Sequence, residues 1–222
     1  TTIAPAGTVV FTLDGSTKST ISLTNGLATA TFTGLSAGAH TVSATYTSTD
    51  GYASVSSATS SVTVGLATQT INFTAPTSPV TYGVSPITLS ASSTSGLAVT
   101  FSVVSGPGTI GGSRLTVTGA GTIQIAANQA GNVNYTAAQQ VTQSIVVNKA
   151  TPVITWANPA PIISGTALSA TQLNATASVP GAFVYNPASG TVLNSGTQTL
   201  NAAFTPTDTA DYTTAAATVM LI

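Results

Sequence analysis

Apolar and polar residues alternate with a period of two in short runs along almost the whole chain. Turn signals rich in Gly, Asn or Asp separate the runs, such as Asp14-Gly15, Asn25-Gly26 and Asp50-Gly51. A period of two places apolar side chains on one face of a strand, and closely spaced short strands are typical of β-sandwiches and barrels. Helix signals are sparse, because Glu is absent, Lys is rare and β-branched residues are common. The predicted strands include TVVFTLD (8–14), LATATFT (27–33), HTVSATY (40–46), LAVTFSV (97–103), RLTVTG (114–119), TIQIAA (122–127), QSIVV (143–147) and TLNAAF (199–204).

The chain repeats itself at intervals of about 80 residues. VGLATQTINF (64–73) recurs 83 residues later as VNKATPVITW (147–156), and AGAHTVSATYTSTD (37–50) matches SGTQTLNAAFTPTD (195–208) without a gap. A Tyr also stands just before the final alternating run of each repeat. Aromatic residues that recur at one position are best explained as core or corner packing residues. The recurring positions are Phe73 and Trp156, Tyr46 and Phe204, Phe101 and Tyr185, and Tyr52, Tyr135 and Tyr212.

These repeats predict three tandem β-sandwich domains, at residues 1–66, 67–149 and 150–222. Repeats of this length bury their own cores, unlike the repeats of solenoids. Their short linkers predict domains placed end to end in an elongated rod.

The first predicted domain lacks its opening strands. Only seven residues precede TVVFTLD, whereas about 30 precede the matching strand in each of the other two domains. Either upstream residues complete this domain or a neighbouring subunit donates the strands. We expect residues 1–66 not to fold alone, and residues 67–149 to do so.

Composition narrows the classes of function. Charged residues make up 3% of the chain, against about 25% in a typical soluble domain, and the net charge is −1. Three scattered basic residues form no patch for nucleic acid or acidic lipid. Cysteine is absent, which excludes disulfides and thiolate chemistry. No run of 18 apolar residues predicts membrane insertion, and no signal peptide opens the sequence. The near-neutral, Thr- and Ser-rich surface predicts self-association that depends little on salt, with dense glycosylation as a competing explanation for the missing charge.

Two motifs match catalytic or phosphate-binding patterns. GLSAG places Ser36 in a G-x-S-x-G pattern four residues before His40, and GPGTIG (106–111) matches G-x-G-x-x-G. The first motif needs a strand, a sharp turn and then a helix, and the second needs a following helix. Strand patterns follow both motifs, so we interpret the first as a turn and the second as a hairpin.

The sequence gives little support for a metal site or for an intramolecular covalent bond. Asp208 and Asp211 could hold Ca²⁺, but acidic residues in turns usually bond the turn itself. An intramolecular isopeptide bond needs a buried Lys, whereas Lys18 lies in a polar hairpin and Lys149 in a linker. We therefore predict no catalytic residue, no metal site and no cofactor.

Several stretches resemble the immunoglobulin-like repeats of large secreted or cell-surface bacterial proteins. AGTVVFTLDG, GLSAGAHTVSATY and GYA are similar to one subtype, and the long run from TINFTAP to VSGPG together with AGNVNYTAA is similar to another. The resemblance implies immunoglobulin-like β-sandwiches and an extracellular or surface setting, without catalytic residues.

The leading interpretation is therefore a structural segment of an extracellular fibre or cell-surface stalk, which associates with itself or with neighbouring immunoglobulin-like domains, with strand complementation as one mode of assembly. The alternative is an adhesive or carbohydrate-binding module of a larger surface protein. Tyr82 is not among the recurring aromatic positions, so it is the candidate sugar platform.

Overall fold

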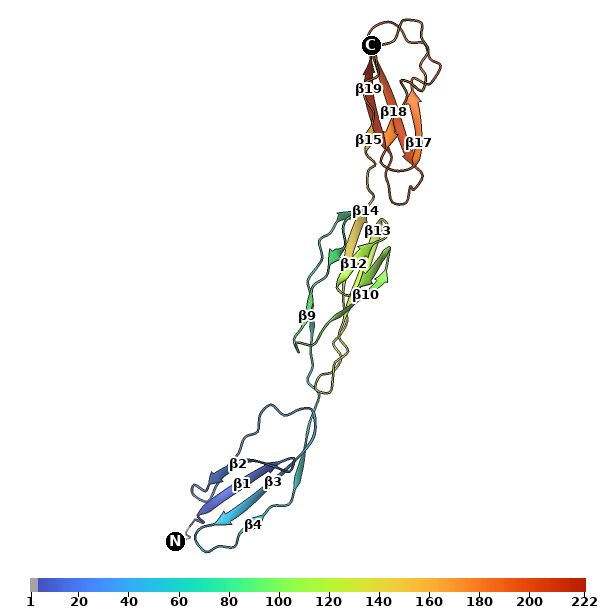
Figure 1. The fold of residues 1–222 in the computed structure, drawn as a ribbon. Coiled ribbons are helices and arrows are strands. Elements are labelled where there is room, and N and C mark those ends of the chain that lie inside the picture. The colour runs from blue at the N-terminus through green and yellow to red at the C-terminus, as the bar shows by residue number, and fades with distance from the viewer. Residues whose placement is uncertain (1–3) are drawn as a thin grey trace. The chain divides into compact units, whose positions relative to one another are not determined.

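The chain is all-β: a computed structural model describes residues 4–222, and within them it contains strands and no helix (Figure 1). The strands are β1 (Gly7–Leu13), β2 (Ser16–Ser22), β3 (Gly38–Ser48), β4 (Val55–Ser56), β5 (Ser60–Val64), β6 (Ile71–Phe73), β7 (Val80–Thr81), β8 (Ile87–Thr88), β9 (Ala91–Ser93), β10 (Thr100–Ser105), β11 (Gly108–Gly111), β12 (Arg114–Val117), β13 (Gly121–Asn128), β14 (Val141–Asn148), β15 (Ile154–Thr155), β16 (Thr176–Ala177), β17 (Gly181–Asn186), β18 (Gln198–Pro206) and β19 (Ala215–Leu221).

The chain forms two compact units, which we describe separately. Unit 1 contains residues up to Ile71, of which those from Ala4 onward are described, together with residues 93–97 and 129–139. Unit 2 contains residues 72–92, 98–128 and 140–222. The predicted division into three domains, with boundaries after residues 66 and 149, stays a prediction.

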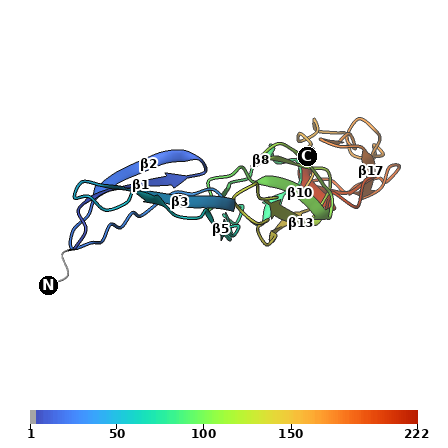
Figure 2. The ribbon, with the colours of Figure 1, turned by 90° about the horizontal axis from the view of Figure 1, so that it is seen from below.

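Unit 1 is built on one antiparallel five-stranded sheet. Its strand order is β2-β1-β3-β4, and β5 also pairs with β3 (Figures 1 and 2). The predicted Asp14-Gly15 turn joins β1 to β2, and both residues have positive φ, 51° and 75°. Paired positive φ values are typical of the tight turn that matches the twist of a hairpin, and Asn25 and Gly26 repeat the arrangement with 54° and 78°.

One predicted strand is absent, because residues 27–33 (LATATFT) form an extended coil between β2 and β3 (Figure 1). Alternation of apolar and polar residues is a property of the segment itself, whereas a strand also needs a neighbouring strand to share its hydrogen bonds. Leu27 bonds back to Thr24 across the Asn25-Gly26 turn, and the pairing stops there within the described part of the chain.

Unit 2 contains small sheets that supply its packed layers. A four-stranded sheet runs β10-β13-β14-β7, and two three-stranded sheets run β11-β12-β8 and β17-β18-β19. β15 pairs with β16, and β6, which begins at the end of unit 1, pairs with β9. The pair of β14 with β7 is parallel, and the other pairs of the four-stranded and three-stranded sheets, like that of β15 with β16, are antiparallel. The GPGTIG motif falls on the β11–β12 hairpin, as predicted.

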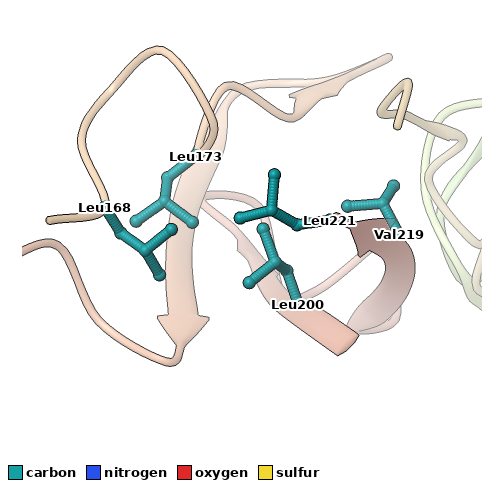
Figure 3. Close-up of a cluster of buried hydrophobic side chains, with 5 residues drawn as sticks. All are labelled: Leu168, Leu173, Leu200, Val219 and Leu221. Carbon is teal, nitrogen blue, oxygen red and sulfur yellow. The ribbon is translucent and has the colours of Figure 1, made fainter. Parts of the chain in front are cut away.

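The cores lie where the opening segments of the later repeats cover the strands that follow them. In residues 150–222, Leu168 and Leu173 from coil segments lie beside Leu200 and Leu221 from β18 and β19 (Figure 3). Trp156 and Tyr185 pack against this cluster, with ring centroids 5.4 Å apart. The matching buried residues of 67–149 are Ile71, Phe73, Leu89, Leu115, Ile123, Ile125, Ile145 and Val147.

Two glycines mark equivalent close approaches in different repeats. A Cβ atom at Gly7 would lie 2.2 Å from the carbonyl oxygen of Thr47 and 2.7 Å from the ring of Tyr46. A Cβ atom at Gly181 would lie 2.4 Å from both the carbonyl oxygen of Thr205 and the ring of Phe204. Tyr46 and Phe204, which match in the sequence repeat, therefore each lie against a glycine, Gly7 and Gly181 respectively.

Candidate interaction surface

The sheet of unit 1 has one apolar and one polar face. Val9 lies opposite Tyr46 on β3 and Ile21 on β2, and Phe11 lies opposite Ala44. Directly paired residues project on the same side of a sheet, so these side chains share one face. The opposite face carries mainly Thr and Ser, among them Thr8, Thr20, Ser43, Thr45 and Thr47. We call the first set, with Val42, Val55 and Val62, the apolar face.

The apolar face is incompletely covered. Among residues 4–66, Leu13 is the only apolar side chain that is buried, at 5% exposure. Val55 is 63% exposed and Val62 is 46% exposed, whereas Phe11 and Tyr46 are half-buried. Each buried apolar side chain contributes about 1.5–3 kcal/mol, so this region gains little from its core.

Residues 28–33, which we call the crossing segment, lie between β2 and β3 as a single stretch without strand pairing. Ala28, Ala30 and Phe32 are half-buried, and the three Thr residues that alternate with them are exposed. This alternation turns the apolar side chains of the segment inward. No backbone group of residues 28–33 has a hydrogen bond to another backbone group within residues 4–222.

The equivalent segment of the second repeat is paired with an opening strand. Thr31-Phe32-Thr33-Gly34 corresponds to Thr116-Val117-Thr118-Gly119, which places Ala30 at the position of Leu115. Leu115 on β12 is fully buried and pairs with Ile87 on β8. The amide of Leu89 donates to the carbonyl of Ser113 at 2.8 Å, and Leu89 is 3% exposed.

The third repeat makes the same kind of backbone hydrogen bonds with its opening segment. The amide of Leu168 donates to the carbonyl of Thr191 at 2.8 Å, and the amide of Gly190 donates back to the carbonyl of Leu168 at 2.8 Å. Leu168 is 2% exposed and packs on Leu200. The gap-free match of 37–50 with 195–208 makes Val42, on the apolar face, the counterpart of Leu200.

A polar atom on the apolar face also lacks a partner. Ser19 lies opposite Phe11, and its hydroxyl oxygen is buried without a hydrogen bond to any described residue. Buried hydroxyls are nearly always bonded, and leaving one unpaired costs about 1–3 kcal/mol. The unpaired crossing segment, the half-covered apolar face and this hydroxyl all belong to unit 1.

His40 lies on β3, two residues after the GLSAG motif that resembles a nucleophile elbow. Its Nδ1 lies 2.7 Å from a carboxylate oxygen of Asp14, and its Nε2 lies 2.9 Å from the backbone carbonyl oxygen of Ser36. Asp14 also accepts from the amide of Thr41 at 2.8 Å. The residue types of a Ser-His-Asp triad therefore meet, but the imidazole faces the carbonyl of Ser36.

This geometry favours a protonated imidazole. Both ring nitrogens face oxygen atoms that only accept hydrogen bonds, so each nitrogen needs a proton. The hydrogen bond to Asp14, and then the bond to Ser36, raise the pKa of His40 above its ordinary 6.5. The bond from His40, and then the bond from Thr41, lower the pKa of Asp14 below 3.8. A protonated ring has no lone pair to accept a proton from Ser36. The ring instead bonds the loop that leads into β3, at Ser36, to Asp14. The GLSAG stretch therefore forms a turn that leads into a strand, as the sequence interpretation expected.

The two acidic residues considered as calcium ligands serve backbone groups. Asp208 accepts from the amides of Ala210 and Asp211 at 3.0 and 3.2 Å, which is the turn role expected from the sequence. Asp211 accepts from the amide of Ala120 at 2.6 Å. No group of three potential metal-ligating side chains occurs among the described residues.

Tyr82, the candidate sugar platform, packs against another aromatic residue of unit 2. Its ring meets that of Tyr212 edge to face, with centroids 5.5 Å apart. The negative charge of Asp211 is the main cause that raises the pKa of Tyr82. A shallow hollow borders the pair and is also lined by Val179, Pro180, Thr207 and Asp208.

The recurring tyrosines occupy a backbone clamp in two of the repeats. Ala67 pairs in parallel with Tyr135, and Ala150 pairs in parallel with Tyr212. In each case the Ala amide donates to the carbonyl of the residue before the Tyr, and the residue after the Tyr donates to the Ala carbonyl, all at 2.9 Å. The Ala of the Ala-Thr pair that recurs in the two linkers is therefore the residue that makes these backbone bonds. Tyr52, the third member of the series, is 53% exposed.

The other recurring aromatic residues lie in the strands or directly beside them. Phe73 is 5% exposed and its ring centroid lies 5.3 Å from that of Phe101, and Phe204 is 1% exposed. Tyr46 donates to the carbonyl of Ala6 at 2.7 Å, and Trp156 donates to the carbonyl of Gln172 at 3.0 Å.

Comparison with known proteins identifies the class of the first repeat. Residues 1–65 match the family described as bacterial Ig-like domain (group 3). The predicted resemblance to bacterial immunoglobulin-like repeats is therefore confirmed, and this match covers the part of the chain that carries the crossing segment. No curated protein sequence matches the chain.

The solved structures that resemble this chain share low sequence identity with it. Fibronectin(III)-like modules of Clostridium thermocellum CbhA are 20% identical, with a TM-score of 0.30 and coverage of 67% of this chain and 81% of theirs. Drosophila N-cadherin is 12% identical, with a TM-score of 0.28 and coverage of 82% and 58%. An S-layer protein is 11% identical, with a TM-score of 0.28 and coverage of 96% and 35%. Among the described residues, no helix is long and apolar enough to cross a membrane.

Proposed function

We propose that this chain is a structural segment of an extracellular fibre or cell-surface stalk, that it lacks enzymatic activity, and that strand complementation joins it to neighbouring immunoglobulin-like domains. The match of residues 1–65 to a bacterial immunoglobulin-like domain is the observation that carries this proposal. The repeated Ala–Tyr clamps, which tie the start of a repeat to the segment that precedes its final strand, support a role in bearing load.

The proposal is tested by stretching single molecules of the 222-residue chain from its two ends. Antiparallel strands that are pulled along their length resist until several hydrogen bonds break together, so unfolding should occur in discrete force peaks. Complete extension of the 83 residues 67–149 should add roughly 28 nm of chain length. Smooth extension without force peaks would contradict a load-bearing role.

Association of the chain provides a separate test. With only seven charged residues, three basic and four acidic, contacts between chains should depend little on electrostatic screening. Sedimentation over a concentration series should therefore show the same self-association in low and high salt. A chain that stays monomeric at every concentration and salt would remove self-association from the proposal.

A further inference from the structure

The two later repeats define what the crossing segment of the first repeat should bind. In both of them the equivalent segment bonds, through its backbone, with an opening segment whose Leu is buried: Leu89, directly after β8, in one case and Leu168, in a coil segment, in the other. The first repeat has the same crossing segment, but residues 28–33 lack such a partner within the described chain. Both leucines are already paired and buried in their own repeats, so neither is available as the partner.

Backbone geometry identifies the free edge. The N–H and C=O groups of one strand residue point to the same edge, and those of its neighbour point to the opposite edge. Ser113 and Leu115 face β8, and their counterparts in the crossing segment are Ala28 and Ala30. The edge formed by Ala28 and Ala30 is therefore the one that accepts an added strand.

The side chains define the chemistry of the added strand. Leu168 packs on Leu200, whose counterpart on the apolar face is Val42, so the inward position of the added strand should carry a Leu. Outward positions should carry Ser or Thr, as Thr88 and Ser90 do beside Leu89. No residue of the crossing segment is charged, so the interaction needs no complementary charge.

We propose that residues 28–33 form an acceptor edge for an extended β-strand with an alternating Ile-x-Leu pattern that comes from outside residues 4–222. The inserted strand bonds Ala28 and Ala30 through its backbone, while its Leu covers Val42 and the adjoining apolar face. Strand addition to an exposed edge is an established mode of peptide recognition, with affinity from the backbone and specificity from the inward side chains. This inference rests on the strand-complementation part of the proposed function and names the acceptor and the donor pattern.

The test uses the whole chain and a synthetic peptide of residues 85–92 (SPITLSAS), with the same peptide carrying Leu89→Thr as the control. Hydrogen exchange is measured at residues 28–33 over a series of peptide concentrations. When the free peptide concentration is about 100 times its Kd, exchange at Ala28 and Ala30 should slow about 100-fold. The control peptide should produce no slowing at the same concentration.

Two proline variants of the chain test the assigned edge. Ala30→Pro removes an N–H on the acceptor edge and should abolish peptide binding, whereas Thr31→Pro removes an N–H on the opposite edge and should leave binding intact. Equal loss in both variants, equal binding of the two peptides, or strong protection of Ala28 and Ala30 in the peptide-free monomer would overturn the proposal. The force experiment does not depend on these results: a chain that resists force but binds no peptide keeps its load-bearing role and loses only the acceptor edge.

Discussion

Replacing Leu168 with Ala should destabilise residues 150–222 by about 2–5 kcal/mol, the range for buried Leu-to-Ala changes. Leu168 is 2% exposed and lies in the cluster with Leu173, Leu200 and Leu221 (Figure 3). The change removes three carbon atoms, which costs about 2.4 kcal/mol in transfer free energy at about 0.8 kcal/mol for each. Incomplete collapse of the resulting cavity adds to this value.

Trp156 makes the effect measurable in the intact chain. It is the single tryptophan, and it packs against the same cluster, so its fluorescence reports on residues 150–222 alone. With a urea m-value of about 1–2 kcal/mol per molar, the unfolding midpoint should fall by at least about 1 M. Ile163→Ala is the matched control, because Ile163 belongs to the same opening segment but is 83% exposed and should cost no more than about 0.5 kcal/mol. Equal midpoints for the two variants would refute the role of Leu168 as a core residue.

Three further predictions follow from the close approach at Gly181, the His40–Asp14 pair and Tyr82. Gly181→Ala should destabilise residues 150–222 by at least about 1–3 kcal/mol, because the new Cβ atom would lie 2.4 Å from a backbone oxygen. Gly111→Ala is the control, because Gly111 has open space around it and the change should cost less than about 1 kcal/mol. Equal losses of stability in urea unfolding of the two variants would contradict this expectation. The His40–Asp14 pair should stabilise the sheet of unit 1 fully between pH 3.8 and 6.5. The pKa of His40 is raised in the folded state, so the stability that His40 contributes is lost as the pH rises through its folded-state pKa. The pKa of Asp14 is lowered in the folded state, so the stability that Asp14 contributes is lost as the pH falls through its folded-state pKa. An NMR titration of His40 should give a pKa above 6.5, His40→Gln should remove the loss of stability on the alkaline side, and a pKa at or below 6.5 would show that the ring is not held by two acceptors. If the chain instead acts as a carbohydrate-binding module, a glycan array should show binding that Tyr82→Ala abolishes; absence of binding by the unchanged chain would count against that alternative.

Several features were predictable because they depend on local sequence. The Asp14-Gly15 and Asn25-Gly26 turns follow from the tolerance of these residue types for positive φ, and both turns occur as expected. The GPGTIG stretch forms a hairpin, because the residues that follow it alternate as a strand does. The GLSAG stretch could likewise be assigned to a turn, since a strand pattern follows it, and β3 begins at its last residue, Gly38.

The sequence predicted only part of the candidate interaction surface. Comparing the lengths of the repeats led to the expectation that the first repeat lacks opening strands, but it did not indicate the acceptor edge at Ala28 and Ala30. A usable signal was present in the Leu-Ser-Ala of residues 89–91 and 168–170, although the same three letters at 35–37 lie in the loop that leads into β3. Short segments of this kind cannot be assigned to a strand without knowing what they pair with.

The sequence by itself determined that the chain is all-β, where it turns and which positions recur, because alternation and turn chemistry act over a few neighbouring residues. Only the tertiary structure decided which alternating segments become strands. LATATFT and RLTVTG have the same pattern, yet only the second forms a strand, because β8 and β11 lie beside it. The tertiary structure also decided that Tyr82 meets Tyr212 and that His40 faces a carbonyl oxygen. Hydrogen bonds between strands and contacts between rings join residues far apart in the chain, and local periodicity carries no information about those partners.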